Sequence, residues 1–134
     1  EGWAHYTEKM MIEEGFGDGD PRYKLVQMKW KLRGIANAII DQKIHAGKMT
    51  EDEAMELMVK ETFQEEAEAS AKWRRAQLSF GQLSTYFVGS TLMWDLKRDV
   101  EEKWGSNFNL KEFHEELLSH GSIPIRHLRR IMLD

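Results

Sequence analysis

The sequence predicts an all-α fold of about six helices. Helix-capping residues recur before amphipathic segments, glycines follow several of these segments, and no stretch alternates apolar and polar residues long enough for a strand. The 134 residues are 41% hydrophobic and 31% charged, which is typical of a folded globular protein. Because the linkers are short, we expect one helical domain over residues 1–134.

Each expected helix has a start signal, a stop signal or both. The expected ranges are 1–14, 21–46, 50–60, 62–78, a continuation from a weaker start at residue 79 to residue 104, 110–120 and 124–132. The side chains expected to open helices are Asp20, Thr50, Thr62, Ser79, Asn109 and Ser122. The glycines that follow expected helix ends are Gly47, Gly105 and Gly121. The first helix has no cap, so we expect it to begin upstream of Glu1, outside this chain.

The composition excludes several classes of function. Lys and Arg number 19 against 23 Asp and Glu, and the net charge of −4 argues against a nucleic-acid partner. The basic cluster at residues 126–130 is short and suits the C-terminal end of a helix. The absence of cysteine excludes disulfides, thiolate metal sites and cysteine nucleophiles.

Residues 76–94 form the longest stretch without a formal charge, which raises the question of a membrane span. Glutamine, serine and threonine recur within it, so the stretch is too polar to face lipid. We expect a helix that is buried in protein on most faces, and no membrane span within this chain.

The most distinctive segment is EGWAHYTE at residues 1–8. On a helix, Glu1, His5 and Glu8 share one side because they are four and three residues apart. Glu1 and His5 suit a two-ligand half of a metal site, while an ion pair or a solvated polar stripe explains the same spacing. Whether His5 contacts a metal stays open. The chain contains no HExxH motif, phosphate-binding loop or nucleophile elbow.

Four segments of the chain resemble one bacterial family. EGWAHYTE resembles the EGWAxYxE motif of helical, zinc-metallopeptidase-like proteins grouped as domain of unknown function 885 (DUF885). Residues 39–54 look like the family's D-x-G-I-H-x-x-x-W-[ST]-x-E-x-A region, although Lys43 and Met49 replace its glycine and tryptophan. Residues 80–97 look like its P-G-Q-x-x-x-Y-x-x-G helix, with Phe80 in place of proline. Residues 108–128 are similar to the family's ending.

This resemblance implies the C-terminal half of a larger, gluzincin-like zinc metallopeptidase fold. In such enzymes an HExxH helix supplies two histidine ligands and a general-base glutamate, and a later helix supplies the third ligand. The implied third ligand here is Glu1, while the HExxH motif would lie in a missing N-terminal region. The implied substrates are peptides or small amides. We expect the isolated fragment to be inactive and to bind zinc weakly or not at all.

The resemblance also suggests roles for four further residues. Tyr86 is a candidate catalytic donor to an oxyanion, although a buried structural tyrosine is an equal interpretation. Gln82, one helical turn earlier, is a candidate substrate-binding residue. His45 is a second catalytic candidate, and its position at a helix end also suits a structural role. Glu8 either holds a hydrogen bond behind the metal ligand or is a surface charge.

Two other functions remain as alternatives. The chain could be a non-catalytic helical interaction module, such as a degenerate descendant of a peptidase, or a free-standing adaptor whose apolar face binds a partner helix. The state of the HExxH motif upstream separates the first alternative from an enzyme. The family resemblance favours an extracytoplasmic location, either periplasmic or as a lipoprotein.

Overall fold

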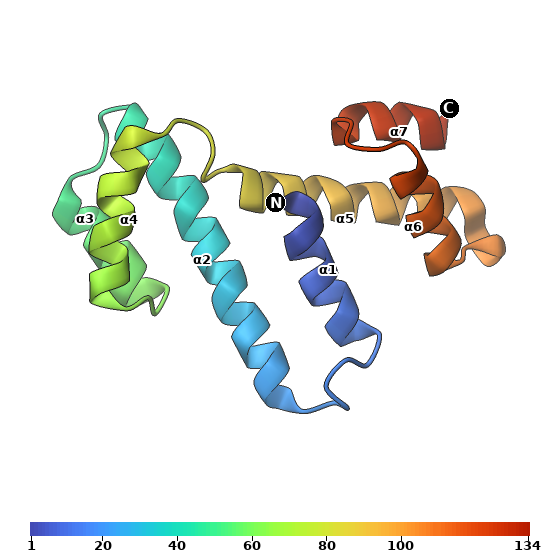
Figure 1. The fold of residues 1–134 in the computed structure, drawn as a ribbon, viewed down its shortest axis with the longest axis horizontal. Coiled ribbons are helices and arrows are strands. Elements are labelled where there is room, and N and C mark those ends of the chain that lie inside the picture. Colours follow the sequence, from blue (N-terminus) through green and yellow to red (C-terminus); the bar gives the residue numbers. More distant parts are fainter. The chain divides into compact units, whose positions relative to one another are not determined.

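The computed structural model describes residues 1–134 and confirms the all-α class (Figure 1). It contains seven α-helices, one π-helical segment and one 3₁₀ turn, where the sequence predicted about six helices. The helices are α1 (Gly2–Glu13), α2 (Pro21–His45), α3 (Glu51–Met55), α4 (Glu66–Leu78), α5 (Thr85–Trp104), α6 (Leu110–Ser119) and α7 (Ile125–Leu133). The π-helical segment is Glu56–Glu61 and the 3₁₀ turn is Gly105–Asn107.

The chain divides into two units, Glu1–Ser90 and Thr91–Asp134. The division falls within α5 and not at a linker. The single domain expected from the sequence therefore stays a prediction.

In the first unit, the long helix α2 packs against α1 and α4 (Figure 1). Its buried C-terminal half meets α4 and the π-helical segment through a core of small and medium side chains. The core residues are Ile40, Ala54, Met58, Ala69, Ala76 and Leu83. Alanines at three of these six positions allow the helix backbones to approach closely, and this fixes the positions of side chains on facing helices.

In the second unit, the end of α5 packs with α6 and α7 around its own apolar core. The buried residues are Met93, Leu96, Val100, Phe113, Leu117, Leu128 and Met132. Arg129 on α7 pairs with Asp99 on α5. Lys103 donates to the carbonyl oxygen of Leu133 at 2.8 Å, which satisfies a free carbonyl at the end of α7.

Local capping signals predict three helix starts correctly. The Asp20 carboxylate accepts from the backbone N–H of Arg22 at 2.9 Å. Thr50 and Glu53 form the reciprocal capping box. Asn109 accepts from the backbone N–H of the third residue of α6 at 3.1 Å.

The expected helix start at Thr62 is wrong. The Thr62 hydroxyl donates to the carbonyl oxygens of Leu57 and Met58, at 3.1 and 3.0 Å, and so it closes the preceding π-helical segment. Helix α4 begins only at Glu66, and Glu65 precedes it without a side-chain cap. The free carbonyls of the π turn compete for the hydroxyl that sequence reasoning assigned to the next helix.

The expectation for residues 76–94 is also corrected. Helix α5 begins at Thr85, six residues after the weaker start signal at Ser79. Apolar side chains in this stretch are exposed, including Leu78 at 88% and Phe80 at 80%, so the segment is not buried on most faces. None of the helices combines the length and the apolar character that a membrane crossing requires.

Helices α1 and α5 touch through their backbones at Gly2 and Gly89. A Cβ atom on Gly2 would lie 2.4 Å from the carbonyl carbon of Gly89, and one on Gly89 would lie 2.8 Å from the Cα of Gly2. Real Cβ atoms do not approach backbone so closely, so both positions require glycine. This close approach fixes the start of α1 next to the start of α5.

We predict that Gly89→Ala lowers the free energy of unfolding by about 1–3 kcal/mol, because the new methyl group overpacks a backbone contact. Gly34→Ala is the matched control, since Gly34 also lies within a helix but its Cβ would meet no atom closer than 3.8 Å. That substitution should raise stability by up to about 1 kcal/mol through helix propensity. Urea unfolding of both variants measures the difference, and equal effects would contradict the tight contact.

Candidate functional site

The predicted site residue Tyr86 lines a polar pocket of the first unit, with a volume of about 180 Å³. Side chains from α1, α2, α4 and the start of α5 line it. They are His5, Trp30, Arg33, Gly34, Asn37, Lys72, Arg75, Leu83 and Tyr86. Gly34 faces His5 and Tyr86 from the middle of α2, and a Cβ atom there would lie at ordinary contact distances of 3.8 and 3.9 Å from their side chains. The pocket thus combines three basic groups with a phenol, an imidazole and an amide.

Tyr86 and Gln82 lie together, with Gln82 in the turn before α5 and Tyr86 in the first turn of that helix. The Gln82 amide donates to the Tyr86 hydroxyl oxygen at 3.2 Å. The amide oxygen of Gln82 accepts from Arg75 at 3.0 Å. Because the phenol oxygen is already an acceptor here, its own proton remains available for a further partner in the pocket.

The motif helix α1 brings His5 to the same pocket. The His5 ring meets the edge of the Tyr86 ring, with centroids 5.5 Å apart and planes at 75°. Its Nδ1 lies 3.7 Å from a carboxylate oxygen of Glu8. Glu1 precedes α1, is exposed and makes no capping hydrogen bond with its side chain. Helical spacing places Glu1 on the His5 side of α1.

His45 contacts main chain and does not line the polar pocket. Its Nε2 lies 3.0 Å from the carbonyl oxygen of Ala76 and 2.6 Å from that of Ser79, so this nitrogen carries the ring proton. The ring also packs edge-on against Phe80 at a centroid distance of 4.9 Å. These contacts close the C-terminal end of α4, so His45 is placed to hold the following loop.

Sequence reasoning assigned no role to Asp41, although its carboxylate organises the loop before α5. This buried side chain accepts from the backbone N–H of Gly81 at 3.1 Å and from that of Ser84 at 3.0 Å. It also accepts from the Ser84 hydroxyl at 2.8 Å. The loop carries Gln82 and leads into Tyr86, so Asp41 positions both.

Lys72 and Asn37, like Arg33 and Arg75, are pocket residues that sequence reasoning missed. Lys72 is only 7% exposed, and its ammonium donates to the Gln64 amide oxygen at 2.7 Å. Burial, and then the charges of Arg33 and Arg75, lower the pKa of Lys72 from 10.5 to about 7. The sequence does carry a signal for Lys72, which lies three residues after Ala69 and four before Ala76, on the buried stripe of α4.

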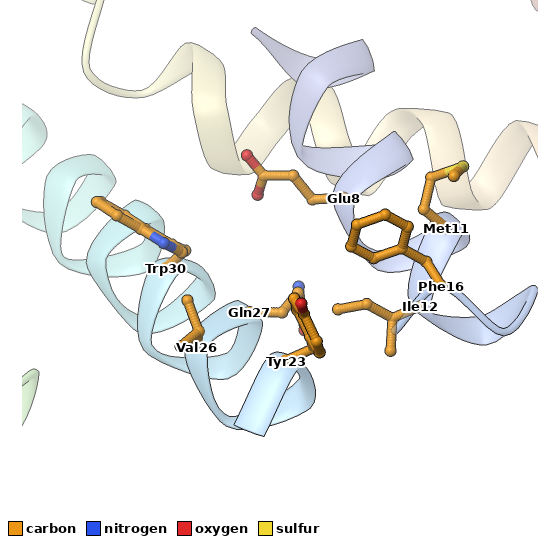
Figure 2. Close-up of a pocket in the computed structure, with 8 residues that line it drawn as sticks. All are labelled: Glu8, Met11, Ile12, Phe16, Tyr23, Val26, Gln27 and Trp30. Atoms are coloured by element: carbon orange, nitrogen blue, oxygen red, sulfur yellow. The ribbon is translucent and has the colours of Figure 1, made fainter. Parts of the chain in front are cut away.

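A second, mostly apolar pocket of about 330 Å³ lies between α1 and α2 (Figure 2). Its residues are Glu8, Met11, Ile12, Phe16, Tyr23, Val26, Gln27 and Trp30. This pocket is larger than the polar one, but it gathers fewer chemically active groups. Trp30 lines both pockets, and Glu8 of the apolar pocket pairs with His5 of the polar one. The two pockets are therefore neighbours along the α1–α2 interface.

The donor set tests whether the implied zinc fits. Within residues 1–134 no three His, Cys, Asp or Glu side chains form a group that could hold a metal ion. Glu1 offers the kind of carboxylate oxygen that zinc accepts, on a helix fixed by the Gly2–Gly89 contact. A zinc site with three or more protein ligands is therefore compatible with this chain only if at least one ligand comes from outside these residues.

Fold and site together define an all-helical protein with a polar pocket beside a motif helix. The chain matches the family described as bacterial protein of unknown function (DUF885) over residues 1–132, and it belongs to this family. It is similar to the solved structure of a candidate lipoprotein of unknown function from Shewanella oneidensis, with 48% identity and a TM-score of 0.94. The match covers 99% of this chain but only 24% of that structure's chain. Among curated proteins, none matches.

We predict that Lys72 makes stability depend on pH. The folded-state pKa of about 7 lies below the ordinary value of 10.5, so the unfolded chain binds more protons between these values. Stability therefore rises with pH through this window, by up to about 1.4 kcal/mol per pH unit from this group.

Urea unfolding between pH 7 and pH 9.5 measures this slope, because the range lies between the folded-state pKa of about 7 and the ordinary value of 10.5. Lys72→Met should remove the contribution, whereas Lys31→Met, at an exposed position of α2, should keep it. A slope that is the same in wild type and in Lys72→Met would refute the assignment.

Proposed function

We propose that this chain is part of a zinc-dependent peptidase or amide hydrolase and supplies one metal ligand and one wall of the substrate cleft. The observation that carries the proposal is the contact between His5 and Tyr86, with ring centroids 5.5 Å apart. It joins the helix that follows the candidate ligand Glu1 to the helix that bears the candidate oxyanion donor. A zinc hydrolase needs both groups near one scissile carbonyl.

The proposed roles follow from the contacts of each side chain. Tyr86 donates its free hydroxyl proton to the carbonyl oxygen as negative charge develops there. Gln82 forms part of the substrate-binding wall and orients this phenol through its 3.2 Å hydrogen bond. His45 acts on the site indirectly, because it holds the end of α4 before the Gln82 loop. Glu8 orients His5.

Glu1 is the proposed metal ligand of this chain, and two histidines outside residues 1–134 complete the set. When bound, zinc polarises the scissile carbonyl and lowers the pKa of a water nucleophile. The chain spans about a quarter of the length of the Shewanella structure, which leaves room in a protein of that size for the remaining ligands. An extracytoplasmic location is proposed as well, supported by the description of that relative as a candidate lipoprotein.

A second candidate function is a non-catalytic helical interaction module. The observation in its favour is an apolar stripe on the first half of α2, where Leu25 is 68%, Met28 51% and Leu32 36% exposed. These residues are three and four positions apart and share one helical face, as partner helices require. An interaction module without catalysis would not need a stoichiometric metal, so metal content separates the two functions.

We predict that the full-length protein, purified with added zinc, contains about one zinc per chain, as a catalytic site requires. Glu1→Gln should lower this content at least about tenfold, because an amide is a poor replacement for a ligating carboxylate. Glu14→Gln, at the other end of α1, serves as the control and should keep the metal. A metal-free wild type, or a Glu1→Gln protein with full zinc content, would contradict the proposal.

Tyr86→Phe should lower kcat by about a hundredfold with little change in zinc content, because it removes one oxyanion donor and no ligand. Tyr23→Phe changes a tyrosine of the apolar pocket in the same way and should leave kcat unchanged. Hydrolysis of a tryptic casein digest, followed by mass spectrometry of the products, provides the assay. Equal activity of the two variants would exclude Tyr86 from the chemistry.

A further inference from the structure

The polar pocket holds more positive charge than its own carboxylates balance. Arg33 pairs with Glu68, but the other two cations make no ion pair. Lys72 donates only to the neutral amide of Gln64, at 2.7 Å, and Arg75 only to that of Gln82, at 3.0 Å. A lysine that is 7% exposed ordinarily has an anionic partner. The excess of positive charge in the pocket therefore favours an anionic ligand.

The same pocket contains an acceptor without a donor. Asn37 is only 7% exposed, and its side-chain oxygen has no hydrogen-bond partner. An unpaired buried acceptor is costly, and native proteins rarely leave one without a function. Because this oxygen is enclosed, a ligand reaches it only when the Asn37 amide turns toward the pocket. A ligand with an N–H or O–H donor close to its negative charge would then satisfy it.

These two requirements select one kind of ligand. Phosphate and sulfate esters are mainly acceptors at neutral pH and leave the Asn37 oxygen without a donor. Metal cations are repelled by the three basic groups. An N-acylated amino acid carries a free carboxylate and, attached to the same carbon, an amide N–H. Arginine is suited to the carboxylate through paired hydrogen bonds, and a buried lysine gains from the added negative charge.

We propose that the polar pocket binds the free α-carboxylate of an N-acylated amino acid, the chemical form of the last residue of a peptide. Arg75 and Lys72 hold the carboxylate, and the Asn37 oxygen accepts the amide N–H. Carboxylate binding rests on this pocket alone, whereas the assignment of the ligand to a peptide substrate rests on the proposed function. If both hold, the enzyme acts near the C-terminal end of peptides, because the pocket adjoins Tyr86.

Binding of N-acetyl-L-alanine and of N-acetyl-L-alaninamide to the full-length protein, measured by calorimetry, tests the proposal. The free acid should bind at least about tenfold more tightly than the amide, because charge-assisted hydrogen bonds to the carboxylate are lost in the amide. O-acetyl-L-lactate, which replaces the N–H with an ester oxygen, should also bind more weakly than the free acid. This comparison tests the Asn37 contact without changing the protein.

Arg75→Gln and Arg74→Gln provide the matched pair of variants. They are neighbours on α4 and lose the same charge, but only Arg75 lines the pocket. Arg75→Gln should weaken binding of the free acid at least about tenfold, and Arg74→Gln should leave it unchanged. Equal binding of acid and amide would overturn the proposal. Equal effects of the two variants would also overturn it, because the carboxylate would then bind elsewhere, for example to a metal.

The outcome is independent of the proposed catalysis. If the protein contains no zinc and its carboxylate binding depends on Arg75, the pocket assignment is supported and the proposed zinc peptidase activity is contradicted. Peptide hydrolysis that is indifferent to C-terminal amidation, with equal binding of acid and amide, supports the peptidase and overturns the pocket assignment.

Discussion

The carboxylate of Asp41 is the interaction on which the site depends. It accepts hydrogen bonds from the backbone N–H groups of Gly81 and Ser84 and from the Ser84 hydroxyl, on a loop about forty residues further along the chain. Because these are charge-assisted bonds to a side chain that is only 1% exposed, they fix where α5 begins. The position of Gln82 and Tyr86 follows from this start. The candidate site is thus built on a buried anion that takes no part in its chemistry.

The sequence predicted the fold class and most helix ends, because the signals for these features are local. Asp20, Thr50 and Asn109 cap the residues that directly follow them, so their patterns are readable without a tertiary structure. The helix starts predicted at Thr62 and Ser79 were wrong because contacts outside the capping pattern decide them. A π-helical segment competes for the Thr62 hydroxyl, and the distant Asp41 decides where the loop after Ser79 ends.

The residues of the candidate site also differ in whether local sequence could predict them. The motif residues Glu1 and His5, and the pair Gln82 and Tyr86, were predictable because each group lies within one helical segment or turn. Lys72 and Asn37 were not, because they meet only through the packing of α4 on α2. In the sequence the neighbourhood of Lys72 reads as a solvated basic helix, and only the alanines on either side indicate its burial.

The contact of Gly2 with Gly89 has a mechanical consequence. Side chains at an interface can change rotamer and absorb a displacement, whereas two backbones in contact have no such freedom. A displacement of the first turn of α1 toward the start of α5 therefore cannot be absorbed by a side-chain rearrangement at this contact.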